Sequence, residues 1–149
     1  MNANERESLN ALFEEVVGAA YEVSNALGAG FLEKVYERAL AKELSLRGIP
    51  VRPQVPYKIT YKGHPIAEYI ADLVVDDRLL IEVKCVNTLV KEHLAQSLNY
   101  LKASNLSLAL LINFQHPKVV WQRVVREHTA GSNVRTHGMT ASHMAGSCS

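Results

Sequence analysis

The sequence predicts an α/β (α+β) domain in which a central mixed β-sheet of about five strands is flanked by helices, in the order α-α-β-β-β-α-β-β. Three observations predict it. Apolar residues recur every three or four positions through residues 4–46, which is the period of amphipathic helices. Shorter apolar or alternating runs follow in residues 51–86 and 106–126, as expected of strands. A further helical period in residues 88–104 separates these two groups of strands.

Two helices are expected at the start of the chain. Asn4 followed by Glu7 predicts the beginning of the first helix, because a capping Asn and an acidic residue three positions later satisfy free backbone N–H groups. Gly28 and Gly30 end this helix, since glycine tolerates positive φ. The second helix is expected over about residues 31–46, and its inward side is expected to carry Leu32, Val35, Tyr36, Ala39 and Leu40.

The remaining elements follow from apolar runs and turn residues. A third helix is expected to begin after Asn87 or Thr88, either of which can cap it, and to end near Ser104. Strands are expected over residues 51–61, from Pro65 to the acidic turn, and over 79–86, 106–114 and 118–126. The domain therefore spans residues 1–127, and residues 128–149, which are small and polar without periodicity, are expected to be a disordered tail.

Length and composition exclude several classes of protein. A chain of 149 residues is long enough for one domain with a sizeable core. It has no run of 18 apolar residues and begins with the polar segment MNANERESLN, which predicts a cytoplasmic protein with no membrane segment. Cys85 and Cys148 are too few for a disulfide framework or a zinc cluster. Cys85 is expected to be a buried, inert thiol that points away from Lys84.

The net charge of +1 hides an asymmetry along the chain. Residues 5–27 carry five Glu against one Arg, a net charge of −4. Residues 28–127 carry fourteen Lys or Arg against ten Asp or Glu, a net charge of +4. A mildly basic main part of the domain agrees with a partner that bears phosphate groups.

Three ionisable residues interrupt the apolar strands of the hairpin over residues 65–84: Asp72, Glu82 and Lys84. Strand side chains alternate between faces, so Glu82 and Lys84 share one face and Val83 lies on the other. A three-residue loop over residues 76–78 would place Asp72 directly across from Glu82, whereas a two-residue loop would put Asp72 on the opposite face. We favour the three-residue loop, because only that register brings the three charges together.

Two carboxylates placed side by side need compensation. At a separation of ~5 Å and an effective dielectric constant of ~20, they repel by roughly 3 kcal/mol. Lys84, a shared proton or a bridging divalent cation could each offset this repulsion. In a simpler alternative, Asp72 and Glu82 are solvated and Lys84 is their cross-strand partner. The apolar flanks of the charges argue against solvation: Ile70, Val74, Leu80 and Val83.

Further polar side chains are expected to lie near these charges. Glu33 falls at the border of the apolar stripe of the second helix, where it is either solvated or leans into a site. On the third helix, His93, Gln96 and Tyr100 share a face roughly 120° from the apolar stripe. Because this helix follows directly on Lys84, that face is placed to overlook Glu82 and Lys84.

The spacing of Asp72, Glu82 and Lys84 resembles the motif of the PD-(D/E)XK nuclease superfamily, whose fold is restriction-endonuclease-like. Residues 96–100, QSLNY, are similar to the Q-x-x-x-Y helix motif of RecB-like members, and residues 30–36, GFLEKVY, match the motif of the GxxExxY protein family. The resemblance covers about residues 7–127. Ala71 stands where the superfamily name has proline.

This resemblance implies a Mg²⁺-dependent nuclease that hydrolyses phosphodiester bonds in DNA with an activated water as the nucleophile. Asp72, Glu82 and the Val83 carbonyl are then expected to coordinate Mg²⁺, for which Mn²⁺ can substitute. Glu33 is a further ligand or a partner of the water, and Lys84 orients the nucleophile or neutralises developing charge. The residues expected to hold the substrate or support the site are Gln96, Tyr100, His93 and Tyr36.

A second function remains open from the sequence alone. The chain could be a non-catalytic nucleic-acid-binding or partner-binding module that keeps the fold, because it is small and has no long basic segment. A purely binding module has no need for mutually repelling carboxylates, so the complete set of Glu33, Asp72, Glu82 and Lys84 favours catalysis. A homodimer is also expected, since superfamily members often dimerise.

Overall fold

The computed structural model describes residues 1–126 and 134–137. The elements follow the predicted order as far as β5, and the predicted fold class is confirmed. The helices are α1 (Ala3–Leu27), α2 (Glu33–Leu46) and α3 (Lys91–Ser104); the strands are β1 (Val51–Tyr61), β2 (His64–Val75), β3 (Leu79–Lys84), β4 (Leu108–Asn113), β5 (Val120–Arg126) and β6 (Val134–His137).

The sheet follows chain order, β1-β2-β3-β4-β5-β6. Neighbouring strands are antiparallel except β3 and β4, which run parallel. A parallel pair needs a crossover connection, and α3 supplies it here. The connections from β1 to β2, from β2 to β3 and from β4 to β5 each lead directly to the neighbouring strand.

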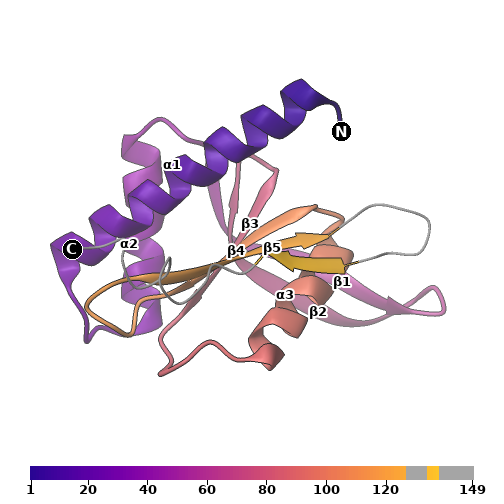
Figure 1. The fold of residues 1–149 in the computed structure, drawn as a ribbon. Coiled ribbons are helices and arrows are strands. Elements are labelled where there is room, and N and C mark those ends of the chain that lie inside the picture. The colour runs from indigo at the N-terminus through magenta and orange to yellow at the C-terminus, as the bar shows by residue number, and fades with distance from the viewer. Residues whose placement is uncertain (127–133, 138–149) are drawn as a thin grey trace.

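Two layers of helices enclose the sheet (Figure 1). On one face, α1 and α2 pack against β3 and β4; on the other, α3 packs against β1, β2 and β5. Every residue of β4 is buried, as predicted from its nearly continuous apolar run. The neighbouring charged strand β3 is buried along its length except at Lys84, which is half-buried. The largest fully buried side chains include Tyr36, Leu40, Leu73, Leu79, Ile81, Leu110 and Phe114.

The predicted disordered tail is wrong for one segment. Val134–His137 forms β6, which pairs antiparallel with β5, so the sheet has six strands rather than about five. The edge of β5 offers unpaired backbone groups to which this segment can bond whatever its side chains are. Its polar composition therefore gave no indication of a strand. The rest of the predicted tail lies outside the described residues.

The helix starts differ from the predictions. Asn2, not Asn4, caps α1, and its side chain accepts a hydrogen bond from the Glu5 N–H at 2.8 Å. The same Asn-x-x-Glu spacing occurs twice in succession, and the structure uses the first copy. On α2, Leu32 and Val35 are 80% and 39% exposed, because the buried side of this helix begins at Tyr36.

The start of α3 is also later than predicted. Neither Asn87 nor Thr88 caps this helix, whose N-cap is Val90. His93 Nδ1 accepts a hydrogen bond from the Val90 N–H at 3.0 Å and so satisfies one free backbone donor. Among the described helices, none is long and apolar enough to cross a membrane.

Candidate functional site

The β2–β3 hairpin opens into a fork at its charged residues. Val75 pairs with Leu79 and Leu73 with Ile81, which confirms the predicted three-residue loop. The pairing stops there: β2 continues along β1, whereas β3 continues along β4. Asp72 and Glu82 are the next residues on each strand and lie at the point where the strands separate.

Strand β2 also changes its buried face at Asp72. Leu73 packs in the core beneath α1 and α2, whereas Ala71 packs in the core beneath α3, although alternation would place both on one face. On the neighbouring strand, the corresponding residue Gln54 has a φ of 52°. This local irregularity gives Asp72 access to both strands of the fork.

Hydrogen bonds from side chain to backbone bridge the fork. The Val83 N–H donates to Asp72 Oδ2 at 2.8 Å, and the Asp72 N–H donates to Glu82 Oε2 at 3.4 Å. These bonds occupy the place where ladder hydrogen bonds would otherwise continue. The structure therefore brings Asp72 and Glu82 together, as the register predicted.

Glu82 is almost completely buried, and the Tyr69 hydroxyl donates a hydrogen bond to its Oε1. Burial, reinforced by the charge of Asp72, raises the pKa of Glu82 to about 8. Tyr69 stacks on Tyr100, with ring centroids 3.5 Å apart and ring planes 7° apart. Through this stack, Tyr100 of α3 lies near the carboxylates as predicted.

Asp72 is influenced by several opposing effects. Burial raises the pKa of Asp72 above its usual value, whereas the hydrogen bond from Val83 favours the ionised form. The positive charge of Lys84 also lowers this pKa. Lys84 itself is half-buried and forms no salt bridge with any acidic residue of the described chain. Lys84 therefore acts on Asp72 through its positive charge, without a direct ion pair.

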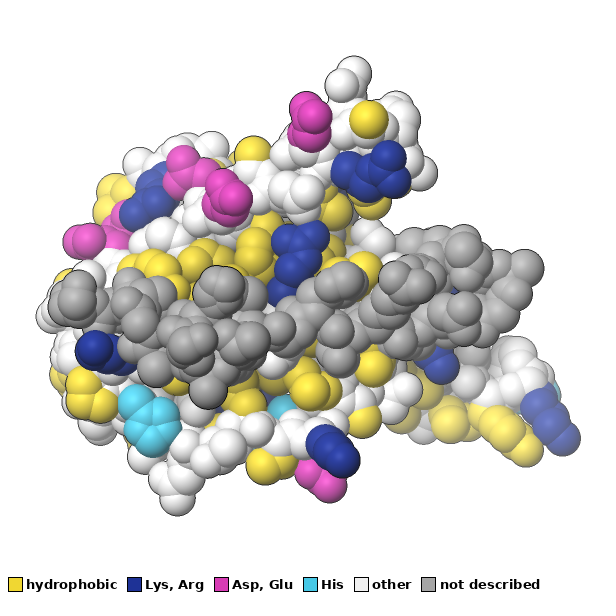
Figure 2. Space-filling model, in the orientation of Figure 1, with side chains coloured by type: hydrophobic (Ala, Val, Ile, Leu, Met, Phe, Trp, Pro, Cys, Tyr) yellow, Lys and Arg dark blue, Asp and Glu magenta, His cyan; other side chains and the backbone are white. Residues whose placement is uncertain are grey.

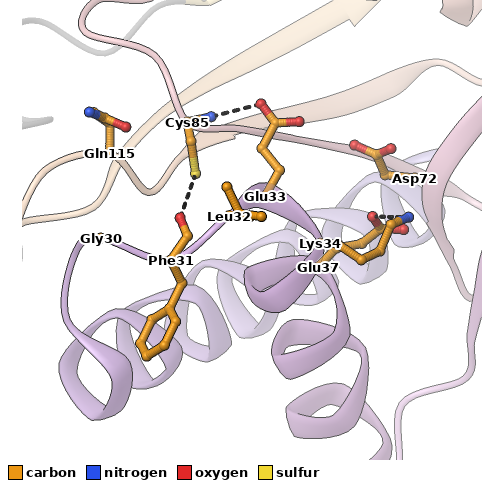
Figure 3. A pocket seen from close by; sticks show the side chains of 9 residues that line it. All are labelled: Gly30, Phe31, Leu32, Glu33, Lys34, Glu37, Asp72, Cys85 and Gln115. Carbon is orange, nitrogen blue, oxygen red and sulfur yellow. Dashed lines mark hydrogen bonds and ion pairs between the residues drawn. The ribbon is translucent and has the colours of Figure 1, made fainter.

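A hollow of about 650 Å³ lies between the start of α2 and the fork. Figure 3 shows Asp72 on one side of it and Glu33 beside Cys85 on another. Glu33 Oε2 accepts a hydrogen bond from the N–H of Cys85, the residue that follows Lys84, at 3.0 Å. The side chains that line the hollow come from Phe31, Leu32, Glu33, Lys34, Glu37, Asp72, Cys85 and Gln115, with the backbone of Gly30.

These elements match a known family over most of the chain. A family model described as the PD-(D/E)XK nuclease superfamily matches residues 10–124. The chain belongs to the PD-(D/E)XK nuclease superfamily. The matched range contains α2, β2, β3 and α3, which carry the predicted site residues, and membership of the narrower GxxExxY family stays a prediction. No curated protein and no solved structure matches the chain.

The donor atoms at the fork of this PD-(D/E)XK protein suit a hard divalent cation. Two carboxylates and the Val83 carbonyl offer oxygen ligands, and Mg²⁺ commonly binds through one or two carboxylates while it keeps several waters. A cation there would offset the repulsion between Asp72 and Glu82. Within the described ranges, no group of three or more His, Cys, Asp or Glu side chains could hold a metal. Glu33 instead lies against the backbone of Cys85.

The sequence analysis missed two residues that lie near the acidic pair of this PD-(D/E)XK domain, Glu37 and Tyr69. Glu37 is buried, forms an ion pair with Lys34 at 2.9 Å and accepts a hydrogen bond from Gln54. Its charge raises the pKa of Asp72. Glu37 follows Glu33 by four residues, so helical spacing could have indicated that both face the same side. Tyr69 had no such signal, because the change of face at Asp72 is not visible in the sequence.

Three other predicted site residues, and Cys85, which was predicted to be inert, have different surroundings from those expected. Gln96 is exposed on α3, and His93 is engaged in capping the same helix. Tyr36 is fully buried, which contradicts a direct substrate contact; its hydroxyl donates to the Gly28 carbonyl at 2.6 Å and accepts from the Phe31 N–H at 3.2 Å. Cys85 is half-buried rather than buried, because β3 ends at Lys84 and the chain leaves the sheet.

Proposed function

We propose that this PD-(D/E)XK superfamily protein is a Mg²⁺-dependent nuclease that hydrolyses phosphodiester bonds in DNA. The proposal is carried by one observation: Asp72 and Glu82 meet at the fork between β2 and β3, bridged by hydrogen bonds to the backbone. A buried pair of repelling carboxylates is a cost to folding unless a cation or a proton offsets the repulsion, and only the cation gives the pair a chemical use.

In this proposal, each residue near the fork has a distinct task. Asp72, Glu82 and the Val83 carbonyl would hold Mg²⁺, or Mn²⁺ in its place. When bound, the ion supplies Lewis-acid activation of water and of the phosphoryl group. Lys84 stabilises the negative charge that develops on the phosphate, and Glu33 accepts a hydrogen bond from the attacking water.

Residues on α3 would support the substrate side of the site. Tyr100 buttresses Tyr69 and thereby orients Glu82, since the two rings stack. Gln96 is exposed and free to contact the nucleic-acid backbone, and His93 positions the start of the helix. On the face of the molecule in Figure 2, lysine and arginine side chains are scattered among acidic ones rather than gathered into a band.

Metal binding tests this function without a known substrate. Calorimetry with Mg²⁺ or Mn²⁺ on the wild type and on Glu82→Ala should show binding that the substitution abolishes. Cleavage of single-stranded, double-stranded and branched DNA, each with Mg²⁺ or Mn²⁺, then tests catalysis, and Asp72→Ala should remove it while DNA binding survives. An Asp72→Ala variant that cleaves as well as the wild type would falsify the assignment.

A non-catalytic binding module is the second candidate, and one observation favours it. With a pKa of about 8, Glu82 is mostly protonated at neutral pH when no metal is bound, so it needs no cation. This candidate predicts that Asp72→Ala tightens DNA binding, because it removes a charge that repels phosphate. A homodimer and a cytoplasmic location stay predictions for either function.

A further inference from the structure

The turn that leads into α2 presents large apolar side chains at the hollow. Leu32 is 80% exposed and Phe31 is 49% exposed. Both residues line the hollow together with Asp72 and Glu33. In Figure 3 the Leu32 side chain lies beside Glu33, whereas the Phe31 ring extends outward from the turn, edge-on to Tyr36. Val35, one helical turn later, is 39% exposed and extends the strip. Single exposed apolar residues are ordinary, but these three lie within five positions of sequence and two of them line the hollow.

The turn is fixed in place rather than loosely attached. The buried Tyr36 hydroxyl bridges its two ends, as it donates to the Gly28 carbonyl and accepts from the Phe31 N–H. The Cys85 thiol lies 3.9 Å from the Phe31 carbonyl oxygen, and Glu33 accepts the Cys85 N–H. The turn is therefore tied to the chain immediately after Lys84.

Leu32 also occupies a position that favours a polar residue. It is the N-cap of α2, with extended backbone and no side-chain hydrogen bond to the helix. Ser, Thr, Asp or Asn at an N-cap would satisfy a free N–H group of the first turn. Leucine makes no such bond; the Val35 N–H donates to the Leu32 carbonyl at 3.0 Å instead, and the leucine side chain is exposed to water. Within the part of the chain that the structure describes, no packing contact accounts for leucine at this position.

We propose that Leu32 and Phe31 form an apolar lip that contacts an unstacked base of a DNA strand whose phosphate enters the hollow. The substrate class is then unpaired DNA: single strands and frayed ends. This inference rests on the proposed nuclease function and narrows it. Apolar side chains reach base faces only where the bases are unstacked, whereas an intact duplex presents mainly its phosphates to such a lip.

The charges around the hollow make such a contact useful. Glu33, Glu37 and Asp72 line it against Lys34 alone, so electrostatics without a cation disfavours phosphate. Contact with a base adds attraction that does not depend on charge. The lip would also fix the distance between the base and the fork, because the turn is tied to the end of β3.

The test uses Leu32→Ser. Because serine at this position supplies an N-cap, a loss of DNA binding in this variant could not be attributed to unfolding. The matched control is Leu46→Ser, at the other end of α2, where Leu46 is 70% exposed and away from the hollow. Binding is measured by fluorescence anisotropy with a short labelled DNA strand and with the same sequence as a blunt duplex, with Ca²⁺ in place of Mg²⁺. Cleavage of the same strand with Mg²⁺ is measured in parallel.

The wild type is expected to bind the single strand at least tenfold more tightly than the duplex. Leu32→Ser should lose about tenfold on the single strand, the size of one base contact, and little on the duplex. Leu46→Ser should match the wild type, and the melting temperature of Leu32→Ser should be unchanged or higher. In cleavage, KM should rise with kcat unchanged.

Several outcomes would overturn the lip. Leu32→Ser could bind the single strand as tightly as the wild type does. It could lose affinity equally for the single strand and the duplex, or the wild type could bind neither DNA. A wild-type dimer that Leu32→Ser dissociates in size-exclusion chromatography would assign the turn to self-association instead. If the wild type cuts no DNA but binds single strands through Leu32, the nuclease function alone fails and the lip stands.

Discussion

Tyr69 donates its hydroxyl hydrogen bond to Glu82 at the buried end of the fork, across thirteen positions of sequence. The bond favours the ionised form of Glu82, whereas burial and Asp72 favour the protonated form more strongly. The pKa of the Glu82 carboxyl group therefore lies near neutral pH, and several measurable properties depend on its protonation.

The stability of the metal-free protein should fall as pH rises. The folded state holds a proton on Glu82 up to a pKa of about 8, raised from 4.5, so between these values the folded chain binds more protons than the unfolded chain. Stability is full below about pH 4.5 and is lost as pH rises through 8, by roughly 3–5 kcal/mol. Thermal melts in EDTA between pH 5 and 9 measure this slope.

Two variants control that experiment. Glu82→Gln should flatten most of the slope, because it cannot ionise. Glu68→Gln, at an exposed position of the same hairpin, should keep the slope of the wild type. If Glu82→Gln and wild type lose stability equally between pH 5 and 9, Glu82 is not the group that titrates.

Removing the Tyr69 hydroxyl should weaken metal binding. In Tyr69→Phe, Glu82 loses the donor that favours its ionised form, so its pKa rises further and Mg²⁺ must displace a proton more often. Loss of such an orienting partner is expected to reduce affinity about 10- to 100-fold. Calorimetry near neutral pH measures it. Tyr57→Phe is the control, since it removes a neighbouring hydroxyl and keeps the ring that stacks on Tyr69; an equal loss there would contradict a specific role of the Tyr69 hydroxyl.

Mg²⁺ should stabilise the fold. A ligand that binds only the folded state at a hundred times its Kd adds about 2.7 kcal/mol to the free energy of unfolding. Asp72→Asn should remove this gain while it keeps an oxygen to accept the Val83 N–H. Urea unfolding with and without Mg²⁺ measures the difference. Asp77→Asn in the exposed β2–β3 loop should behave as the wild type, and a gain that survives Asp72→Asn would place the ion elsewhere.

The stability of the turn before α2 should depend on the hydroxyl group of Tyr36. Tyr36→Phe removes the bridge between Gly28 and Phe31, and leaves a backbone carbonyl and N–H without that partner. The expected loss in the free energy of unfolding is about 1–2 kcal/mol by denaturant titration. Tyr61→Phe, at a tyrosine that is 59% exposed, should cost almost nothing. Equal costs in the two variants would show that the bridge contributes little.

Much of the fold follows from local patterns. Loop length and strand alternation were enough to predict the register that places Asp72 beside Glu82, because a register error would expose the apolar side chains of the hairpin. The strands β1 and β4 were readable for a similar reason. Burial alternates along the second half of β1, and the apolar run of β4 is nearly continuous, as its complete burial requires.

Features that depend on irregular backbone could not be read this way. The change of face at Asp72, opposite the positive φ of Gln54, moves Tyr69 to the side of Glu82, and strict alternation hides it. Leu32 was assigned inward because an apolar residue at helical spacing usually is buried. Pairing of β6 with β5 uses backbone groups, so the composition of that segment gives no indication of it.

Chain order in the sheet has a consequence for how the site assembles during folding. Asp72 and Glu82 are separated by a single short loop, and hairpins of this kind close in about 1–10 μs. Glu33 and Tyr100 join only when α2 and α3 dock, which requires contacts more distant in sequence. The pair of carboxylates can thus exist in a partly folded chain before the groups around it are in place, and a divalent ion captured then would act as a folding nucleus.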